Sequence, residues 1–131
     1  MDLLQIENIV KTKLKVIVPR LTEGKFPQMS FTDEISEKTP SFPNVYIHEL
    51  EPSEVGQDLA NNQIHALRST IQIEVSTNTS KNDARIVINA CVRAMKSLGY
   101  SLVVGPTSMK VNNIHRFVIR VRRIVANGDE L

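Results

Sequence analysis

Apolar residues near the start of the chain recur every three or four positions, which is the spacing of a helix that buries one side. The pattern predicts a helix over residues 3–18. Asp2 is a suitable N-cap, and Pro19 predicts that the helix ends just before it, because a residue preceding proline favours an extended backbone. The buried stripe of this helix would consist of Leu3, Ile6, Val10, Leu14 and Ile17.

A second helix is predicted between Ser80 and Gly99. Ser80 lies three positions before Asp83, which is a capping-box spacing with Asp in place of Glu. Gly99 can adopt the left-handed conformation that ends a helix. One continuous apolar stripe connects the two ends and consists of Ala84, Val87, Ile88, Cys91, Met95 and Leu98.

Extended segments are predicted between and after the helices. Ile71, Ile73 and Val75 alternate with polar residues, as in a half-buried strand. The strands are expected over 29–31, 44–50, 64–75, 100–104 and 114–125. Loops are expected at 32–43 and 51–63 and at Gly105-Pro106 and Asn112-Asn113, with a frayed tail over 127–131.

The order of elements is α-β-β-β-α-β-β, and most links are short enough to favour antiparallel neighbours. We therefore expect an α+β fold, with a mostly antiparallel sheet packed against two helices. A chain of 131 residues suits a single domain that spans residues 1–131. Since no apolar run approaches the roughly 18 residues of a membrane span, we expect a soluble protein without membrane contact.

Charge is distributed unevenly along the chain, although the net charge is only +2. Residues 1–66 contain ten acidic and six basic residues, whereas residues 67–131 contain four acidic and ten basic residues. The acidic residues concentrate in the two expected loops, and the basic residues in the last strand. Two readings remain open: either these are solvated faces of one domain, or they are complementary surfaces of neighbouring subunits.

The sequence predicts no enzyme, metal site or cofactor site. The three histidines lie apart from one another and from Cys91, which belongs to the apolar stripe of the second helix. The five glycines form no phosphate-binding motif. The acidic pairs lie in polar segments, where nothing would separate their pKa values for acid–base catalysis.

The last strand is the most informative remaining feature. On a strand, Arg116, Arg120 and Arg122 point to one side of the sheet. This side could face water, contact phosphates, or contact acidic loops of another subunit. The low net charge and the scarcity of aromatic residues argue against a dedicated nucleic-acid binder.

We therefore expect a subunit interface between basic and acidic segments. On the second helix, Ile86 lies nearly opposite the core stripe and is a weak additional sign of a partner surface. The expected interface residues are Glu49, Glu51, Glu54, Ile86, Arg116, Arg120, Arg122 and Arg123.

Several short runs, spread over residues 41–128, resemble the tail-terminator (tail-completion) proteins of long-tailed bacteriophages. These runs are Ser41-Phe42-Pro43-Asn44-Val45-Tyr46-Ile47, Glu49-Leu50, Ile71-Gln72-Ile73-Glu74-Val75, Ala94-Met95-Lys96, Arg116-Phe117 and Arg122-Arg123. The first 40 residues match this family only in the order of elements.

The resemblance implies a virion structural protein without an active site, located in the neck at the top of the tail. It implies a hexameric ring that caps the tail tube, joins it to the head-side connector and lets DNA pass through its channel. Another neck or head-completion protein is one alternative, and a small nucleic-acid-binding module that uses the arginine strand is another.

Overall fold

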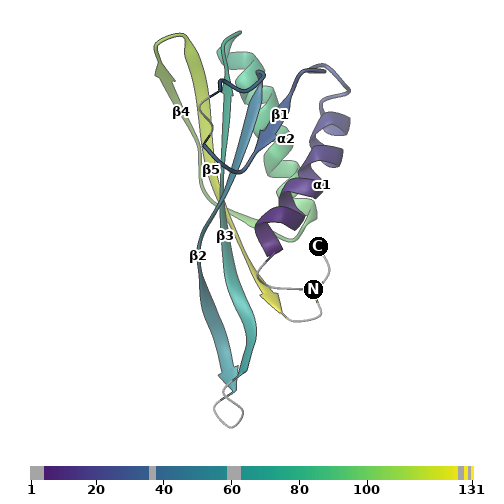
Figure 1. Ribbon diagram of the computed structural model, residues 1–131, viewed down its shortest axis with the longest axis vertical. Coiled ribbons are helices and arrows are strands. Elements are labelled where there is room, and N and C mark those ends of the chain that lie inside the picture. Colours follow the sequence, from purple (N-terminus) through teal and green to yellow (C-terminus); the bar gives the residue numbers. More distant parts are fainter. Residues whose placement is uncertain (1–4, 36–37, 59–62, 127–128, 130) are drawn as a thin grey trace.

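The computed structural model describes residues 5–35, 38–58, 63–126, 129 and 131, with backbone only at 54–58 and 63–65. These residues form two helices and five strands in the expected order (Figure 1). The α+β fold class is confirmed. The elements are α1 (Ile6–Leu21), β1 (Ser30–Thr32), β2 (Asn44–Asp58), β3 (Gln63–Thr77), α2 (Lys81–Ser97), β4 (Ser101–Val111) and β5 (Ile114–Ala126).

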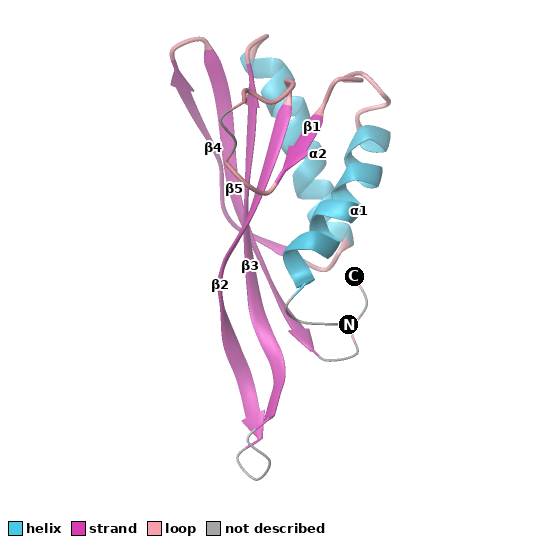
Figure 2. Ribbon diagram, in the orientation of Figure 1, coloured by secondary structure: helices cyan, strands magenta, loops and turns pink. Residues whose placement is uncertain are grey.

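The strands form one mixed sheet in the order β1-β2-β3-β5-β4. Three of the four neighbouring pairs are antiparallel, as expected, but β1 runs parallel to β2, with Ser30 opposite Asn44. The link between β1 and β2 is long enough to return the chain in the same direction. Both helices lie on the same side of the sheet (Figure 2), so no helix covers its other face, which we call the uncovered face. At one end of this face, residues of the 33–43 loop, including Glu34, line a pocket together with Tyr46 and Arg116.

The predicted loop over 51–63 is wrong for the described residues. β2 continues to Asp58 and β3 begins at Gln63, so the two strands form a long hairpin that extends past the helices (Figure 1). Pro52 lies in a bulge between Leu50 and Ser53. We call Ser53–Asp58 and Gln63–Arg68 the arm. Its polar sequence resembles a loop because most of it projects beyond the core, where backbone pairing does not require an alternating apolar pattern.

The first helix begins and ends later than expected. Pro19 lies inside its last turn, and the end is closed by Thr22, whose backbone N–H donates to the Val18 carbonyl at 3.0 Å. The expected stripe is also shifted at this end, because Val18 is buried where Ile17 is only half-buried. Asp2 and Leu3 lie outside the described residues. Gln5 occupies the N-cap position without a side-chain cap.

The second helix agrees with its prediction. The Asp83 backbone N–H donates to Ser80 Oγ at 3.0 Å, and the Asp83 carboxylate accepts a hydrogen bond from the Thr79 hydroxyl at 2.6 Å. Gly99 has φ +87° and follows the helix end. Every residue of the predicted stripe is buried. Burial raises the pKa of the Cys91 thiol to about 12, as expected for a core residue.

The loop expected at Gly105-Pro106 is instead part of β4. This strand continues to Val111, and only Asn112-Asn113 forms the turn to β5. The strand is irregular at Gly105, where the register with β5 shifts between Val104 and Thr107. Gly105 has φ +92°, and a Cβ there would collide with the Val118 carbonyl oxygen. Glycine is therefore required at this bulge.

The two other expected loop regions have different outcomes. Between Asp33 and Pro43, the described residues contain no helix or strand, so the expected loop is confirmed there. The expected frayed tail falls partly on 127–128 and 130, outside the described residues. Within the tail, the Asp129 carboxylate accepts from the Ala126 backbone N–H at 2.8 Å, and Leu131 packs against the core. Asp129 and Leu131 are thus held in place.

The core lies between the helices and the covered face of the sheet. The α1 residues Ile6, Val10 and Leu14 are fully buried there, as is most of the α2 stripe. The sheet contributes alternate residues from its three central strands. These are Val45, Ile47, Ile71, Ile73, Val75, Phe117, Ile119, Val121 and Val125.

Candidate functional site

The uncovered face of the sheet presents four arginines on two neighbouring strands. Arg116, Arg120 and Arg122 alternate with buried residues of β5, as the sequence predicts. Arg68 joins them from β3, where it lies opposite Ile124 of β5. We call these four residues the arginine row. Sequence analysis missed Arg68, because its segment was read only for its apolar alternation.

Three of these arginines are held in position by neutral side chains of β3. In each of them Nε donates a hydrogen bond to the side chain directly opposite on the neighbouring strand. The acceptors are Ser76 Oγ for Arg116 (3.1 Å), Gln72 Oε1 for Arg120 (2.9 Å) and Thr70 Oγ1 for Arg122 (3.3 Å). These contacts orient the guanidinium groups and leave their Nη atoms available to an external oxyanion.

The charge of the arginine row is not neutralised within the described part of the chain. No carboxylate among the described side chains lies within 4.0 Å of these guanidinium groups. Among the described residues of β3 and β5 that share this face with the arginines, one is acidic: Glu74, which lies opposite Val118. A partly hydrated arginine without an acidic partner attracts carboxylate or phosphate. The uncovered face is therefore a candidate surface for an anionic partner.

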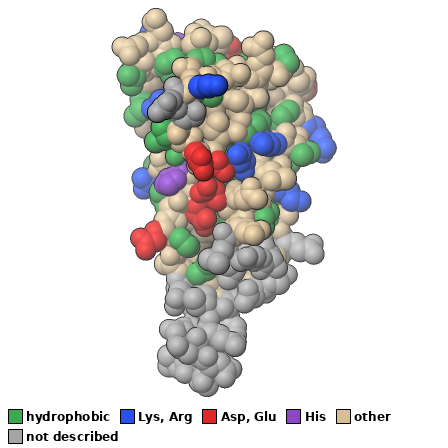
Figure 3. Space-filling model, in the orientation of Figure 1, with side chains coloured by type: hydrophobic (Ala, Val, Ile, Leu, Met, Phe, Trp, Pro, Cys, Tyr) green, Lys and Arg blue, Asp and Glu red, His purple; other side chains and the backbone are tan. Residues whose placement is uncertain are grey.

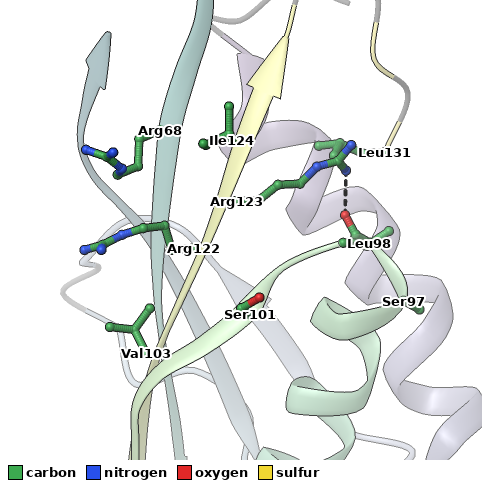
Figure 4. Close-up of a pocket in the computed structure, with 10 residues that line it drawn as sticks. Arg68, Ser97, Leu98, Ser101, Val103, Arg122, Arg123, Ile124 and Leu131 are labelled. Atoms are coloured by element: carbon green, nitrogen blue, oxygen red, sulfur yellow. Dashed lines mark hydrogen bonds between the residues drawn. The ribbon is translucent and has the colours of Figure 1, made fainter. Parts of the chain in front are cut away.

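Arg123, the fourth expected basic residue, lies on the other face. Its Nη1 donates to the Leu98 carbonyl at 2.6 Å, and its Nη2 lies 3.6 Å from the Asp129 carboxylate. Figure 4 shows Arg68 and Arg122 extending to one side of the sheet, while Arg123 points the opposite way, toward the end of α2. Arg123 therefore caps the Leu98 carbonyl at the helix C-terminus.

A shallow hollow of about 810 Å³ lies where β3, β5 and the end of α2 meet (Figure 4). It connects Arg68 and Arg122 of the arginine row with Ser101 and Val103 of β4. Its lining contains no acidic side chain among the described residues. The lining residues are Arg68, Ser97, Leu98, Gly99, Ser101, Val103, Arg122, Arg123, Ile124 and Leu131.

Glu49 lies on the covered face, next to Glu7 of α1. The Glu49 backbone N–H donates to Glu7 Oε2 at 2.8 Å, and Glu49 Oε1 is buried without a hydrogen-bond partner among the described residues. Burial, and secondarily the charge of Glu7, raise the pKa of Glu49. Acidic side chains also gather in the middle of the face drawn in Figure 3. Glu49 and the arginine row thus occupy opposite faces of the sheet.

The other expected interface residues are scattered. Glu51 is exposed on β2, and Ile86 of α2 is only half-buried. The backbone of Glu54 lies opposite Leu67 in the arm, and its side chain is outside the described residues. Within one subunit, the structure therefore brings together Arg116, Arg120 and Arg122 but not the remaining five residues. An interface between copies does not require them to meet within one copy.

Sequence analysis also missed an exposed apolar strip along β4, which we call the β4 edge. Its residues Val103, Val104, Met109 and Val111 are 45–53% exposed. β4 is the last strand of the sheet, so one of its sides has no neighbour among the described residues. The run Leu102-Val103-Val104 was visible in the sequence, but nothing there indicated that the strand would continue to an exposed edge.

The described residues contain no group of three or more His, Cys, Asp or Glu side chains arranged to hold a metal ion. In the same part of the chain, neither helix is long and apolar enough to cross a membrane. His48 is exposed and stacks on Tyr46, with ring centroids 6.2 Å apart, and the side chain of His65 lies outside the described residues.

In comparisons with known proteins, the chain matches no protein-family model and no curated protein. The geometry defines a two-layer α+β protein with a basic uncovered sheet face, an exposed apolar edge and a projecting hairpin arm.

Proposed function

We propose that this chain is a structural ring subunit of the tail-terminator type, without enzymatic activity. Copies would assemble into a hexameric ring that caps the tail tube of a long-tailed bacteriophage and joins it to the head-side connector. DNA would pass through the central channel. The proposal combines the resemblance of residues 41–128 to this family with two exposed surfaces of the fold, the arginine row and the β4 edge.

The observation that carries the proposal is the separation of charge between the two lateral halves of the sheet, β2 on one side of β3 and β5 with β4 on the other. The segment of β2 contains four acidic residues and no Lys or Arg, whereas residues 101–126 contain five Lys or Arg and no acidic residue. These strands are separated by β3 within one copy. Complementary charges on opposite sides of a subunit favour a head-to-tail contact between copies.

The same fold gives the ring its further contacts in this proposal. The arm projects beyond the body and can reach past a subunit boundary or toward the tube. The exposed β4 edge adds apolar surface that a monomer would leave in water.

Self-association can be tested on the purified chain by size-exclusion chromatography with light scattering at low and high salt. We expect a discrete oligomer that weakens as salt screens the complementary charges, and rings in negative-stain electron microscopy. Gold-labelled antibody against the chain should mark the head–tail joint of virions that contain it. A monomer at every concentration, together with virions that carry no label at the joint, would falsify the proposal.

A nucleic-acid-binding module is the second candidate, because the Nη atoms of Arg116, Arg120 and Arg122 are available to phosphates. It predicts a DNA affinity that falls steeply with salt and is reduced by Arg120→Ala. Label on the head side of the joint would instead favour another neck protein.

A further inference from the structure

The sheet has two free edges, one on each side. Along its 11 residues, β4 has no strand beyond it in the described part of the chain. On the other side, the three-residue β1 covers only Asn44–Tyr46 of β2, which leaves the backbone of residues 47–58 without a neighbouring strand among the described residues. The Glu49 N–H at this edge is bonded to Glu7 Oε2, and an added strand would have to displace that side chain. Unpaired backbone N–H and C=O groups at such edges can accept a strand from another chain. The two edges are similar in length.

The directions of the edge strands are compatible with each other. β2 is antiparallel to β3, β3 is antiparallel to β5, and β5 is antiparallel to β4. It follows that β4 is antiparallel to β2. A second copy placed beside the first in the same orientation would therefore extend the sheet with an antiparallel pair, which has the more favourable hydrogen-bond geometry.

Both edges contain a proline in a bulge. Pro52 interrupts β2 between Leu50 and Ser53, and Pro106 interrupts β4 between Val104 and Thr107. Bulges and prolines normally protect an edge against flat strands. A strand with a bulge at the corresponding position avoids this mismatch, because the interruptions then face each other. In this register Met109 lies opposite His48. Both side chains point to the uncovered face, because within one copy Met109 pairs with Arg116, and His48 pairs with Gln72.

The side chains of the two edges are also complementary. Four of the seven large apolar residues that are most exposed in the described structure lie on β4. The free part of β2 is acidic in sequence, whereas β4 has Lys110 and no acidic residue. Like charges would oppose the pairing of two β2 edges. With β4 against β2 in this register, Lys110 lies opposite Ile47 and diagonal to Glu49 on the same face, so no like charges meet.

We propose that β4 of one copy pairs with the free edge of β2 of a second copy, so that the sheet continues across the subunit boundary. This inference rests on the proposed self-association and specifies which surfaces form it. The contact is head-to-tail, so every added copy offers a new edge until the ring closes. The occupant of the β4 edge is therefore a second copy of this chain.

Disulfide crosslinking between two single-substitution proteins tests this pairing. One protein carries Met109→Cys and the other His48→Cys, both at exposed positions, and one of them has a tag that changes its size. Opposed residues of an antiparallel pair are close enough for a disulfide. The unaltered chain, whose only thiol is the buried Cys91, serves as the background control. A mixture of Met109→Cys with Lys13→Cys, an exposed position on α1, is the matched control.

We expect mild oxidation of the mixed proteins to give a mixed dimer at least tenfold in excess of the control mixture. We expect little dimer from either protein alone, because the contact is heterologous. Efficient dimers of Met109→Cys alone would show a symmetric β4–β4 contact and overturn the proposal. An oligomer without the mixed crosslink, or no oligomer at any concentration, would also overturn it.

Hydrogen exchange of the unaltered chain provides a second test that needs no substitution. Raising the concentration should slow exchange together at residues 47–56 and 101–111, and leave the exposed face of α1 unchanged. Protection elsewhere alone would overturn the pairing. If the gold-labelled antibody marks the head–tail joint but the crosslink does not form, the proposed function stands and the β4–β2 pairing is wrong. If the crosslink forms but the antibody does not mark the joint, the pairing stands and the proposed function is wrong.

Discussion

The two faces of the sheet are built from the same strands but have opposite roles. On β5, Phe117, Ile119 and Val121 are buried under the helices, while Arg116, Arg120 and Arg122 alternate with them on the uncovered side. Because successive side chains of a strand point to opposite faces, one strand can stabilise the fold with half of its residues. The other half remains available for contacts with a partner.

The faces also differ in how their polar groups are satisfied. On the covered face, Arg123 bonds the Leu98 carbonyl, and the Ser69 and Tyr100 hydroxyl groups lie 2.8 Å apart in a hydrogen bond. On the uncovered face, the arginines donate to neutral residues and have no acidic partner among the described residues. The covered face is thus largely complete within one copy, whereas the uncovered face is suited to an external anion.

The largest difference in stability between variants of the two faces is expected for Ile73 and Gln72, which are neighbours on β3. Ile73 is fully buried, so Ile73→Ala should lower the free energy of unfolding by about 2–5 kcal/mol through lost burial and a cavity. Gln72→Ala on the uncovered face should change it by no more than about 0.5 kcal/mol. Urea unfolding monitored by circular dichroism measures both. Equal losses would contradict the distinction between the two faces.

Adjacent arginines provide a matched pair with a smaller expected effect. Arg123→Ala removes the hydrogen bond to the Leu98 carbonyl and the contact with Asp129, and should cost about 1–2 kcal/mol of unfolding free energy. Arg122→Ala should cost about 0.5 kcal/mol or less, because it removes an exposed contact. Thermal unfolding distinguishes the two variants. A larger loss for Arg122→Ala would show that the assignment of the two side chains is reversed.

Glu49 is the exception on the covered face, and its expected effect depends on pH. Its pKa is raised above 4.5, so the folded state binds the proton more tightly than the unfolded state. Its contribution to stability is therefore present below 4.5 and lost as the pH rises through the folded-state value. Glu49→Gln removes this loss and should stabilise the protein by about 1 kcal/mol at neutral pH.

Urea unfolding over about pH 4–7 tests this expectation. The slope of stability against pH should flatten in Glu49→Gln, while the exposed control Glu51→Gln should retain the slope of the unaltered chain. A variant less stable than the unaltered chain at neutral pH would mean that the Glu49 carboxylate has a favourable partner.

The smallest effect on folding is expected for the uncovered face itself. Replacing Arg116, Arg120 and Arg122 together by Gln should alter the unfolding free energy by about 0.5 kcal/mol or less per site. If these residues contact carboxylates of a neighbouring copy, the oligomer measured by light scattering should become weaker and less sensitive to salt. Unchanged assembly with a lost affinity for DNA would instead favour the nucleic-acid-binding alternative.

The local patterns of the sequence were sufficient for much of the fold. Helical spacing identified both helices, and the Ser80 cap and the Gly99 end were confirmed because they depend only on nearby backbone groups. Alternation also placed Arg116, Arg120 and Arg122 on one side. The predictions at Pro19, Pro52 and Pro106 were wrong because these prolines lie in the last turn of a helix or at bulges of strands, where an element can continue past a proline.

The interface prediction could not be completed from the sequence for a related reason. Charge along the chain grouped Arg123 with Arg122, yet their side chains lie on opposite faces of the sheet. It also grouped Glu49 with Glu51, yet Glu49 is half-buried beside Glu7 whereas Glu51 is exposed. Only the packing of α1 and α2 on one side decides which residues of a strand are buried and which partner each one has.

By itself, the sequence determined the class of fold, the order of its elements and the alternation of arginines with core residues, because these follow from local periodicity. The tertiary structure alone decided that both helices cover the same face, that the polar segment after Leu50 forms an arm, and that β4 is a free edge. These features depend on contacts between residues far apart in the chain, which no local pattern encodes.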